Sequence, residues 1–154
     1  ASNAPAATSV VGTNTIYGTY AFDATTDESV QCRFWTPADW TGVIDLDVVW
    51  RAGATASETE WCIAVISVAD GETGDPAFNA ARCVNDTAKG VANQFNTATR
   101  TTILLTGVAA NEIVFVKFFR NADASDEDST ITDDDDMTGD AELISFRVTM
   151  RRAQ

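Results

Sequence analysis

Carboxylates and thiols are the reactive side chains that this sequence offers, because its 154 residues include no histidine. Without an imidazole there is no Ser-His-Asp triad, no Cys-His pair and no HExxH zinc helix. The remaining residues permit a two-carboxylate glycosidase. Asp45 and Asp47 lie two apart on one strand face, and Glu58 and Glu60 flank a turn. Both pairs are typical of solvent-facing residues, so we predict no enzyme, no catalytic residue and no cofactor.

Residues 121–140 read NADASDEDSTITDDDDMTGD and offer many oxygen ligands of the kind that calcium prefers. An EF-hand loop needs glycine at its sixth position and glutamate at its twelfth, and no register from Asp123 onward supplies both. Like charges at this density repel one another and favour a solvated, mobile loop. We therefore predict no metal site in the segment from Asp123 to Asp140, and leave weak divalent binding open.

Three cysteines, Cys32, Cys62 and Cys83, are too few and too scattered for a zinc site or a disulfide-stapled scaffold. All three lie in apolar, strand-like runs, where cysteine acts as a small buried hydrophobe. A bridge between Cys62 and Cys83 stays open, because it requires the two runs to be neighbours.

Tryptophans raise carbohydrate binding as an alternative, because sugar rings can stack on exposed indoles. Trp50 lies in an alternating apolar run that predicts a core position. Trp40 lies in the loop of residues 37–42, where it either is exposed or closes the end of the domain. We favour the closing role, which leaves carbohydrate the less favoured partner. Exposure of Trp40 in a groove would distinguish the two.

The chain is strongly acidic, with 10 Lys and Arg against 23 Asp and Glu and a formal net charge of −13. Nucleic acids and anionic membranes need a cationic face, so we expect neither as a partner. No window approaches the roughly 18 continuous apolar residues of a membrane helix. Aspartate outnumbers glutamate 16 to 7, which indicates either a saline setting or an ordinary acidic surface.

Any site must be positioned by short runs rich in Val, Ile, Thr, Phe and Trp, which recur from residue 15 onward. Residues 1–13 are small and polar, and predict a flexible, extended arm that packs only where a partner supplies a surface. The N-terminus fits removal of either a methionine or a signal peptide. We predict one all-β domain over residues 14–154, an antiparallel jelly-roll-like β-sandwich. Its strand-like runs are 15–22, 29–35, 43–51, 61–69, 81–85, 98–106, 112–120 and 141–151.

Apolar and polar residues alternate along several runs, which separates a face that packs in the core from a face exposed to solvent. Residues 43–51 alternate with period two, and residues 141–151 place Leu143 on the face opposite to Phe146. We expect the following side chains mostly in the core: Leu46, Val48, Trp50, Ile63, Val65, Leu104, Val114, Val116, Phe118, Phe146 and Val148.

Two early motifs resemble the opening of a small β-domain that is frequent among tailed-bacteriophage virion proteins. They are YGTYAFDA at residues 17–24, with Asp27 and Glu28, and FWTPADWTG at residues 34–42. That family typically has a DATTDE turn, a strand and then PxDWDGG. The resemblance spans about residues 15–150, and departs from the family in a single glycine after Thr41 and a longer acidic loop. Further matches follow in order at residues 75–81, 118–123 and 139–144.

The resemblance implies a jelly-roll-like sandwich on a phage particle, with no catalytic residues to transfer. We expect a non-enzymatic virion structural protein, a capsid decoration (cement) protein on the outer surface of the head, made in the host cytoplasm. Its expected partners are the major capsid protein and the sister subunits of a homotrimer. Alternatives are a tail or tail-fibre module, a secreted carbohydrate-binding β-sandwich, and a filament in which the arm completes a strand of the next subunit.

Overall fold

The computed structural model describes residues 3–122, 127–132 and 135–153, and its regular elements there are β-strands in two antiparallel sheets. The strands are β1 (Ala6–Val11), β2 (Ile16–Phe22), β3 (Ser29–Trp35), β4 (Trp40–Ala52), β5 (Glu58–Val68), β6 (Arg82–Thr87), β7 (Asn96–Leu104), β8 (Ile113–Arg120) and β9 (Ala141–Arg152).

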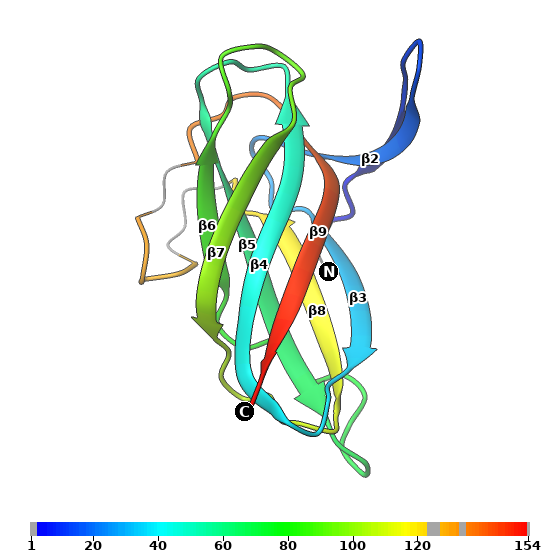
Figure 1. Ribbon diagram of the computed structural model, residues 1–154, viewed down its shortest axis with the longest axis vertical. Coiled ribbons are helices and arrows are strands. Elements are labelled where there is room, and N and C mark those ends of the chain that lie inside the picture. The colour runs from blue at the N-terminus through cyan, green and yellow to red at the C-terminus, as the bar shows by residue number, and fades with distance from the viewer. Residues whose placement is uncertain (1–2, 123–126, 133–134, 154) are drawn as a thin grey trace.

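The strand order is that of a jelly roll. One sheet runs β1-β2-β9-β4-β7 and the other runs β3-β8-β5-β6 (Figure 1). The eight strands from β2 to β9 form one long folded hairpin whose rungs are β5/β6, β4/β7, β3/β8 and β2/β9. Successive rungs alternate between the two sheets, which is how a jelly roll wraps. The predicted all-β sandwich is confirmed.

Aromatic side chains fill the space between the sheets. Phe22 and Phe118 contact Trp61 at ring-centroid distances of 5.3 and 5.5 Å, edge-on and stacked respectively. The Trp50 Nε1–H donates to Asp86 at 2.8 Å, so this buried indole keeps its hydrogen bond. Most of the predicted core residues are confirmed as buried: Leu46, Val48, Trp50, Ile63, Val65, Val114, Val116 and Phe118.

The predicted core position of Leu104 is wrong, because this side chain is 59% exposed. The register between β4 and β7 shifts between Ile44 and Leu46, where β7 carries one extra residue. Thr102 lies in this bulge with φ of 60°. A bulge inverts which side chains face the core, so Ile103 is buried and Leu104 is not.

A second irregularity changes the alternation along β9. The β4–β9 register pairs Val49 with Ser145 and Trp50 with Leu143, which leaves Ile144 as an extra residue. Leu143 is therefore buried together with the half-buried Phe146, although simple alternation places them on opposite faces. Val148 is also half-buried, so the last strand lies at the margin of the core.

The N-terminal segment is not an unpaired arm over its whole length. Residues 6–11 form β1, which pairs with β2 in register from Ala6 with Ala21 to Val11 with Ile16. β2 in turn pairs with β9 only through Tyr20, Ala21 and Phe22. The β1–β2 hairpin therefore projects beyond the sandwich, as the dark blue ribbon at the upper right of Figure 1 shows. The extended arm exists, but it obtains its hydrogen bonds within its own chain.

Candidate functional site

The strand-face carboxylates considered for catalysis are paired with arginines. Asp45 accepts hydrogen bonds from Arg151 at 2.8 Å, and Asp47 accepts from Arg147 at 2.7 Å. These bonds, with the Thr102 N–H on Asp45, hold the pKa of both carboxyl groups below the ordinary range. They form cross-strand ion pairs between β4 and β9 on the outer face of the sheet.

The second carboxylate pair is divided between two environments. Glu60 is buried and accepts a hydrogen bond from the Asn121 side-chain amide at 2.8 Å. Glu58 is half-buried and accepts from the Thr87 hydroxyl at 2.8 Å. The two residues lie two positions apart in β5, and their carboxylates are bonded to different partners.

The acidic loop is anchored at two of its carboxylates, which corrects the prediction of a fully solvated segment. Asp135 forms a bidentate pair with Arg120 at 2.7 and 2.8 Å, and both side chains are buried. Asp128 pairs with Arg100 at 2.6 Å and accepts the Cys83 N–H at 3.0 Å. Residues 123–126 and 133–134 lie outside the described part of the chain.

Asp128 has a strongly lowered pKa. Burial on its own would raise the pKa, but the Thr130 hydroxyl, the Cys83 N–H and the Arg100 guanidinium donate hydrogen bonds that lower it to about 2. The charged form is thus held in place by the fold. The carboxylates of Asp128 and Asp135 accept their hydrogen bonds from protein donors, so both residues hold the loop to the sandwich.

Two cysteines form a disulfide across neighbouring strands. Cys62 and Cys83 are directly paired in the β5–β6 register and are bonded, with an S–S distance of 1.96 Å. Glu60 lies close enough to make a metal-ligand group with them, but the sulfurs are already bonded to each other. Cys32 is a free thiol and is exposed, so its predicted burial is wrong.

The tryptophans divide into buried and exposed ones. Trp40 is only 8% exposed, and its Nε1–H donates to the Val43 carbonyl at 3.0 Å. It closes the end of the sandwich, as predicted, and does not line a groove. Trp35 is 70% exposed at the end of the edge strand β3. Nothing in its neighbouring sequence distinguished it from a core tryptophan, so the sequence reasoning missed it.

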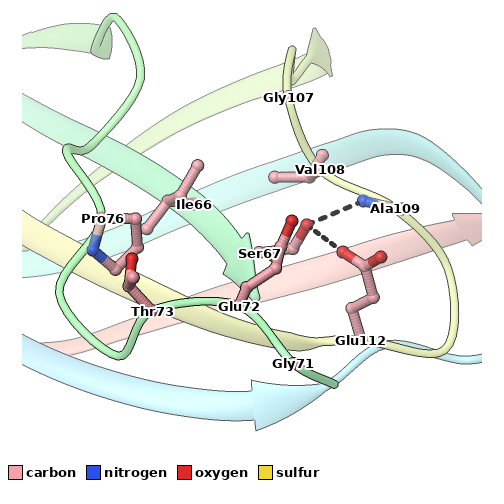
Figure 2. Close-up of a pocket in the computed structure, with 10 residues that line it drawn as sticks. All are labelled: Ile66, Ser67, Gly71, Glu72, Thr73, Pro76, Gly107, Val108, Ala109 and Glu112. Atoms are coloured by element: carbon pink, nitrogen blue, oxygen red, sulfur yellow. Dashed lines mark hydrogen bonds between the residues drawn. The ribbon is translucent and has the colours of Figure 1, made fainter. Parts of the chain in front are cut away.

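A pocket of about 640 Å³ lies at the end of the sandwich. It lies where the connections β5–β6 and β7–β8 meet, and Figure 2 shows Ser67 and Glu112 on its wall. The Ser67 hydroxyl is hydrogen-bonded to the Glu112 carboxylate and accepts the Ala109 N–H at 3.1 Å. Because Ser67 joins the end of β5 to the β7–β8 connection, its hydroxyl is engaged in structure.

The projecting arm is the most unusual surface of the molecule. Residues 1–22 contain no charged side chain, while all 33 charged residues of the chain follow them. At the tip, Val11 and Ile16 are 73% and 74% exposed. One pair further from the tip, Tyr17 packs edge-on against Phe95 at 5.5 Å. A neutral hairpin with an apolar tip is therefore presented away from a highly charged body. The absence of charge was visible in the sequence.

No protein-family model and no curated protein matches this sequence. Among solved structures, the chain is similar to the carbohydrate-binding module TmCBM61 in complex with β-1,4-galactotriose, with a TM-score of 0.41 and 14% identity. That alignment covers 88% of this chain and 71% of the module. Such a likeness assigns no ligand to this chain. Within the described residues there is no helix of the length and apolarity that crossing a membrane requires.

Proposed function

We propose that this chain is a non-enzymatic structural protein of a tailed-phage virion, a capsid decoration protein on the outer surface of the head. The motifs at residues 17–24 and 34–42 resemble that class of virion domain. The carboxylates of Asp45 and Asp47, which were considered for catalysis, are engaged in ion pairs, and the Ser67 hydroxyl on the pocket wall is engaged in loop contacts. The proposed function therefore depends on the surface of the protein, and on how that surface attaches to the capsid.

The projecting β1–β2 arm is the observation that carries this proposal. Its tip exposes Val11 and Ile16 to solvent, where two apolar side chains on neighbouring positions gain stability only when a partner covers them. A rigid sandwich with one reaching arm is suited to a protein repeated on a lattice, because several modest contacts add up to firm attachment. The partners in this proposal are the major capsid protein and the sister subunits of a homotrimer.

The disulfide fits the proposed location. Disulfides persist on virion and cell surfaces and in secreted proteins, and are rare in a reducing cytosol. A protein made in the host cytoplasm would carry Cys62 and Cys83 as thiols until the particle is released. Their direct pairing in the register of β5 and β6 then allows the bond to close without rearrangement of the sheet.

Immunogold labelling of tailed particles tests this function. Antibodies raised against the folded chain should decorate the heads of particles purified from the source sample, at many sites per head. Labelling restricted to tails would overturn head decoration in favour of the tail or tail-fibre alternative. Intact particles without label would overturn the virion proposal as a whole.

Attachment through the arm has its own test. A variant lacking residues 2–12 should keep the far-UV circular dichroism of a β-sandwich, because the hairpin lies outside the core, but should bind emptied heads more weakly in co-sedimentation. A matched variant, Thr13→Ser with Thr15→Ser, changes exposed tip residues but keeps Val11 and Ile16, and should bind as the intact chain does. Equal binding by the truncated variant would show that the arm is not the anchor.

Carbohydrate binding is the second candidate, and the exposed indole of Trp35 is the observation that favours it. Affinity electrophoresis in gels containing a β-galactan or other soluble polysaccharides would test it. Retardation that is lost in Trp35→Ala and kept in Tyr20→Ala, an exposed aromatic control, would support this candidate. No retardation in any gel would remove it.

A further inference from the structure

The edge of β9 that faces β2 is open over most of its length. On its other edge, β9 pairs with β4 from Ala141 to Arg152. Toward β2, the register within the described residues stops at Leu143, because β2 turns away to form the arm. Residues 144–152 therefore present one row of unpaired backbone groups, which is the usual template for adding another strand.

The side chains under this open edge are apolar and incompletely covered. Phe146, Val148 and Met150 point toward the core but are only half-buried. Phe146 stacks on the fully buried Phe118 at 4.5 Å, so the open edge connects directly to the core. A strand laid against β9 would cover apolar side chains as well as backbone groups.

The edge of the other sheet that faces β9 also has apolar side chains that are incompletely covered. Val30, Cys32 and Phe34 pair with the buried residues of β8, so these side chains are directed between the sheets. Cys32 is nevertheless exposed, while Val30 and Phe34 are half-buried. An inward-directed residue is exposed here because the opposite sheet lacks a full-length strand above it. We call the two edges, β9 from 144 to 152 and β3 from 30 to 34, the open seam.

The arm of a second copy has the properties that the open seam requires. β1 is six residues long, which spans about 20 Å at roughly 3.3 Å per residue. The open part of β9 is longer, so β1 fits along it. Its outer edge has no strand partner within the described residues, since β1 ends the sheet order. Val11 and Ile16 then supply the apolar side chains that the seam lacks.

Charge permits a second copy as the occupant, because the arm itself is neutral. Two copies of the chain, each with a net charge of −13, repel each other. An acidic arm would add to this repulsion as it approached the neighbouring copy. The arm carries no charge at all, while the outward face of β9 beside the seam carries Arg147 and Arg151. The neutral arm thus reaches a neighbour without adding charge repulsion to the contact.

We propose that the open seam is an acceptor site for the β1–β2 arm of a second copy of this chain, which adds its β1 to the edge of β9. Each copy is then both donor and acceptor. Such a head-to-tail contact closes into a ring when its rotation permits and otherwise extends into a filament. The contact concerns copies of this chain alone, so it can fail while the virion proposal holds, and the reverse.

Size-exclusion chromatography with light scattering tests the contact without any particle. The intact chain at micromolar to millimolar concentration should elute as a multiple of its 16.5 kDa mass, three-fold for a closed trimer. A monomer at every concentration would overturn the proposal. The donor variant Val11→Ser with Ile16→Ser should dissociate at least ten-fold more readily, and Thr13→Ser with Thr15→Ser should not.

The acceptor is tested by the pair Val148→Lys and Thr149→Lys. Both add one positive charge to β9, but position 148 lies toward the seam and position 149 is exposed on the outer face. We expect the first to be monomeric and the second to assemble as the intact chain does. Equal assembly by both variants would overturn the assignment of the seam.

Mixing separates a blocked contact from a misfolded variant. Val148→Lys keeps an intact arm, and Val11→Ser with Ile16→Ser keeps an intact seam. Combined, they should form a one-to-one complex although each alone is a monomer. If neither variant assembles alone and the mixture also stays monomeric, while both show native circular dichroism, arm-in-seam exchange is refuted.

Discussion

Replacing Asp128 with asparagine tests whether the acidic loop is a structural element of the sandwich. The side chain is buried and joins Arg100 at 2.6 Å to the Cys83 N–H at 3.0 Å. Asparagine preserves the size of the side chain and one carbonyl acceptor but removes the negative charge. It thereby resembles the protonated form of Asp128.

The expected change in the free energy of unfolding follows from the pKa of Asp128. This pKa lies at about 2 in the fold against an ordinary 3.8, and about 1.36 kcal/mol per pKa unit gives roughly 2 kcal/mol of stabilisation. Because the folded-state pKa is depressed, this stabilisation is fully present above pH 3.8 and is lost as the pH falls through about 2. Asp128→Asn should therefore lower the free energy of unfolding by roughly 2 kcal/mol at pH 7.

Urea unfolding followed by tryptophan fluorescence at pH 7, 4, 3 and 2 measures the effect. The deficit of Asp128→Asn should be constant from pH 7 to about 5 and should shrink to a few tenths of a kcal/mol at pH 2. Asp140→Asn, at an exposed position of the same loop, is the control and should differ little from the intact chain. A deficit that is the same at pH 7 and pH 2 would refute the assignment of this stabilisation to the Asp128 charge.

Three further predictions concern salt, the disulfide and the pocket wall. The melting temperature should rise with sodium chloride, because the Debye length falls from roughly 30 Å at 0.01 M to about 3 Å at 1 M and screens the self-repulsion of a −13 chain; a flat or falling curve would contradict this, and a saturable shift with calcium at matched ionic strength would reveal a specific site. Reduction of the disulfide, which closes a 21-residue separation, should lower the free energy of unfolding by about 3 kcal/mol on loop-entropy grounds, measured by urea unfolding with and without reductant; no change would mean that the bridge adds nothing to stability. Gly107 has φ of 65°, and a Cβ there would lie 2.7 Å from the Asn79 side-chain nitrogen; Gly107→Ala should therefore lower the melting temperature by several degrees, whereas Gly90→Ala, with open space around it, should leave it nearly unchanged.

Strand alternation predicted the sandwich and the core wherever a strand is regular. The run from 43 to 51 has its even-numbered residues buried, as its sequence alternation indicates. The errors at Leu104 and Leu143 arise at bulges, where one extra residue inverts the faces. A bulge depends on the backbone of the partner strand, so a single run of sequence cannot reveal it.

The tethers of the acidic loop depend on residues far away in the sequence. The charge density of the loop alone indicates that it is solvated. In the structure, Arg120 holds Asp135 and Arg100 holds Asp128, so these two carboxylates are tied to the sandwich. Their proximity follows from the jelly-roll connections and was not accessible from composition. The β1–β2 hairpin, by contrast, left a signal: residues 6–11 and 16–22 are two strand-like runs on either side of a short loop that begins with Gly12.

The nesting of the strand pairs in the jelly roll also predicts the order in which these pairs form during folding. The innermost rung, β5/β6, joins Cys62 to Cys83 across 21 residues, whereas the outermost rung brings together Thr19 and Glu142 across 123. Loop-closure entropy grows with separation, so we expect the inner rungs to form first and β2/β9 to close last. The arm is attached to the sandwich through the three pairs of this β2/β9 rung, at Tyr20, Ala21 and Phe22, and through the bridge between Asn3 and Glu28. We therefore expect the arm of a newly made chain to reach its final position only as β2 adds Phe22 to the core, so that copies meet through their arms once each is folded.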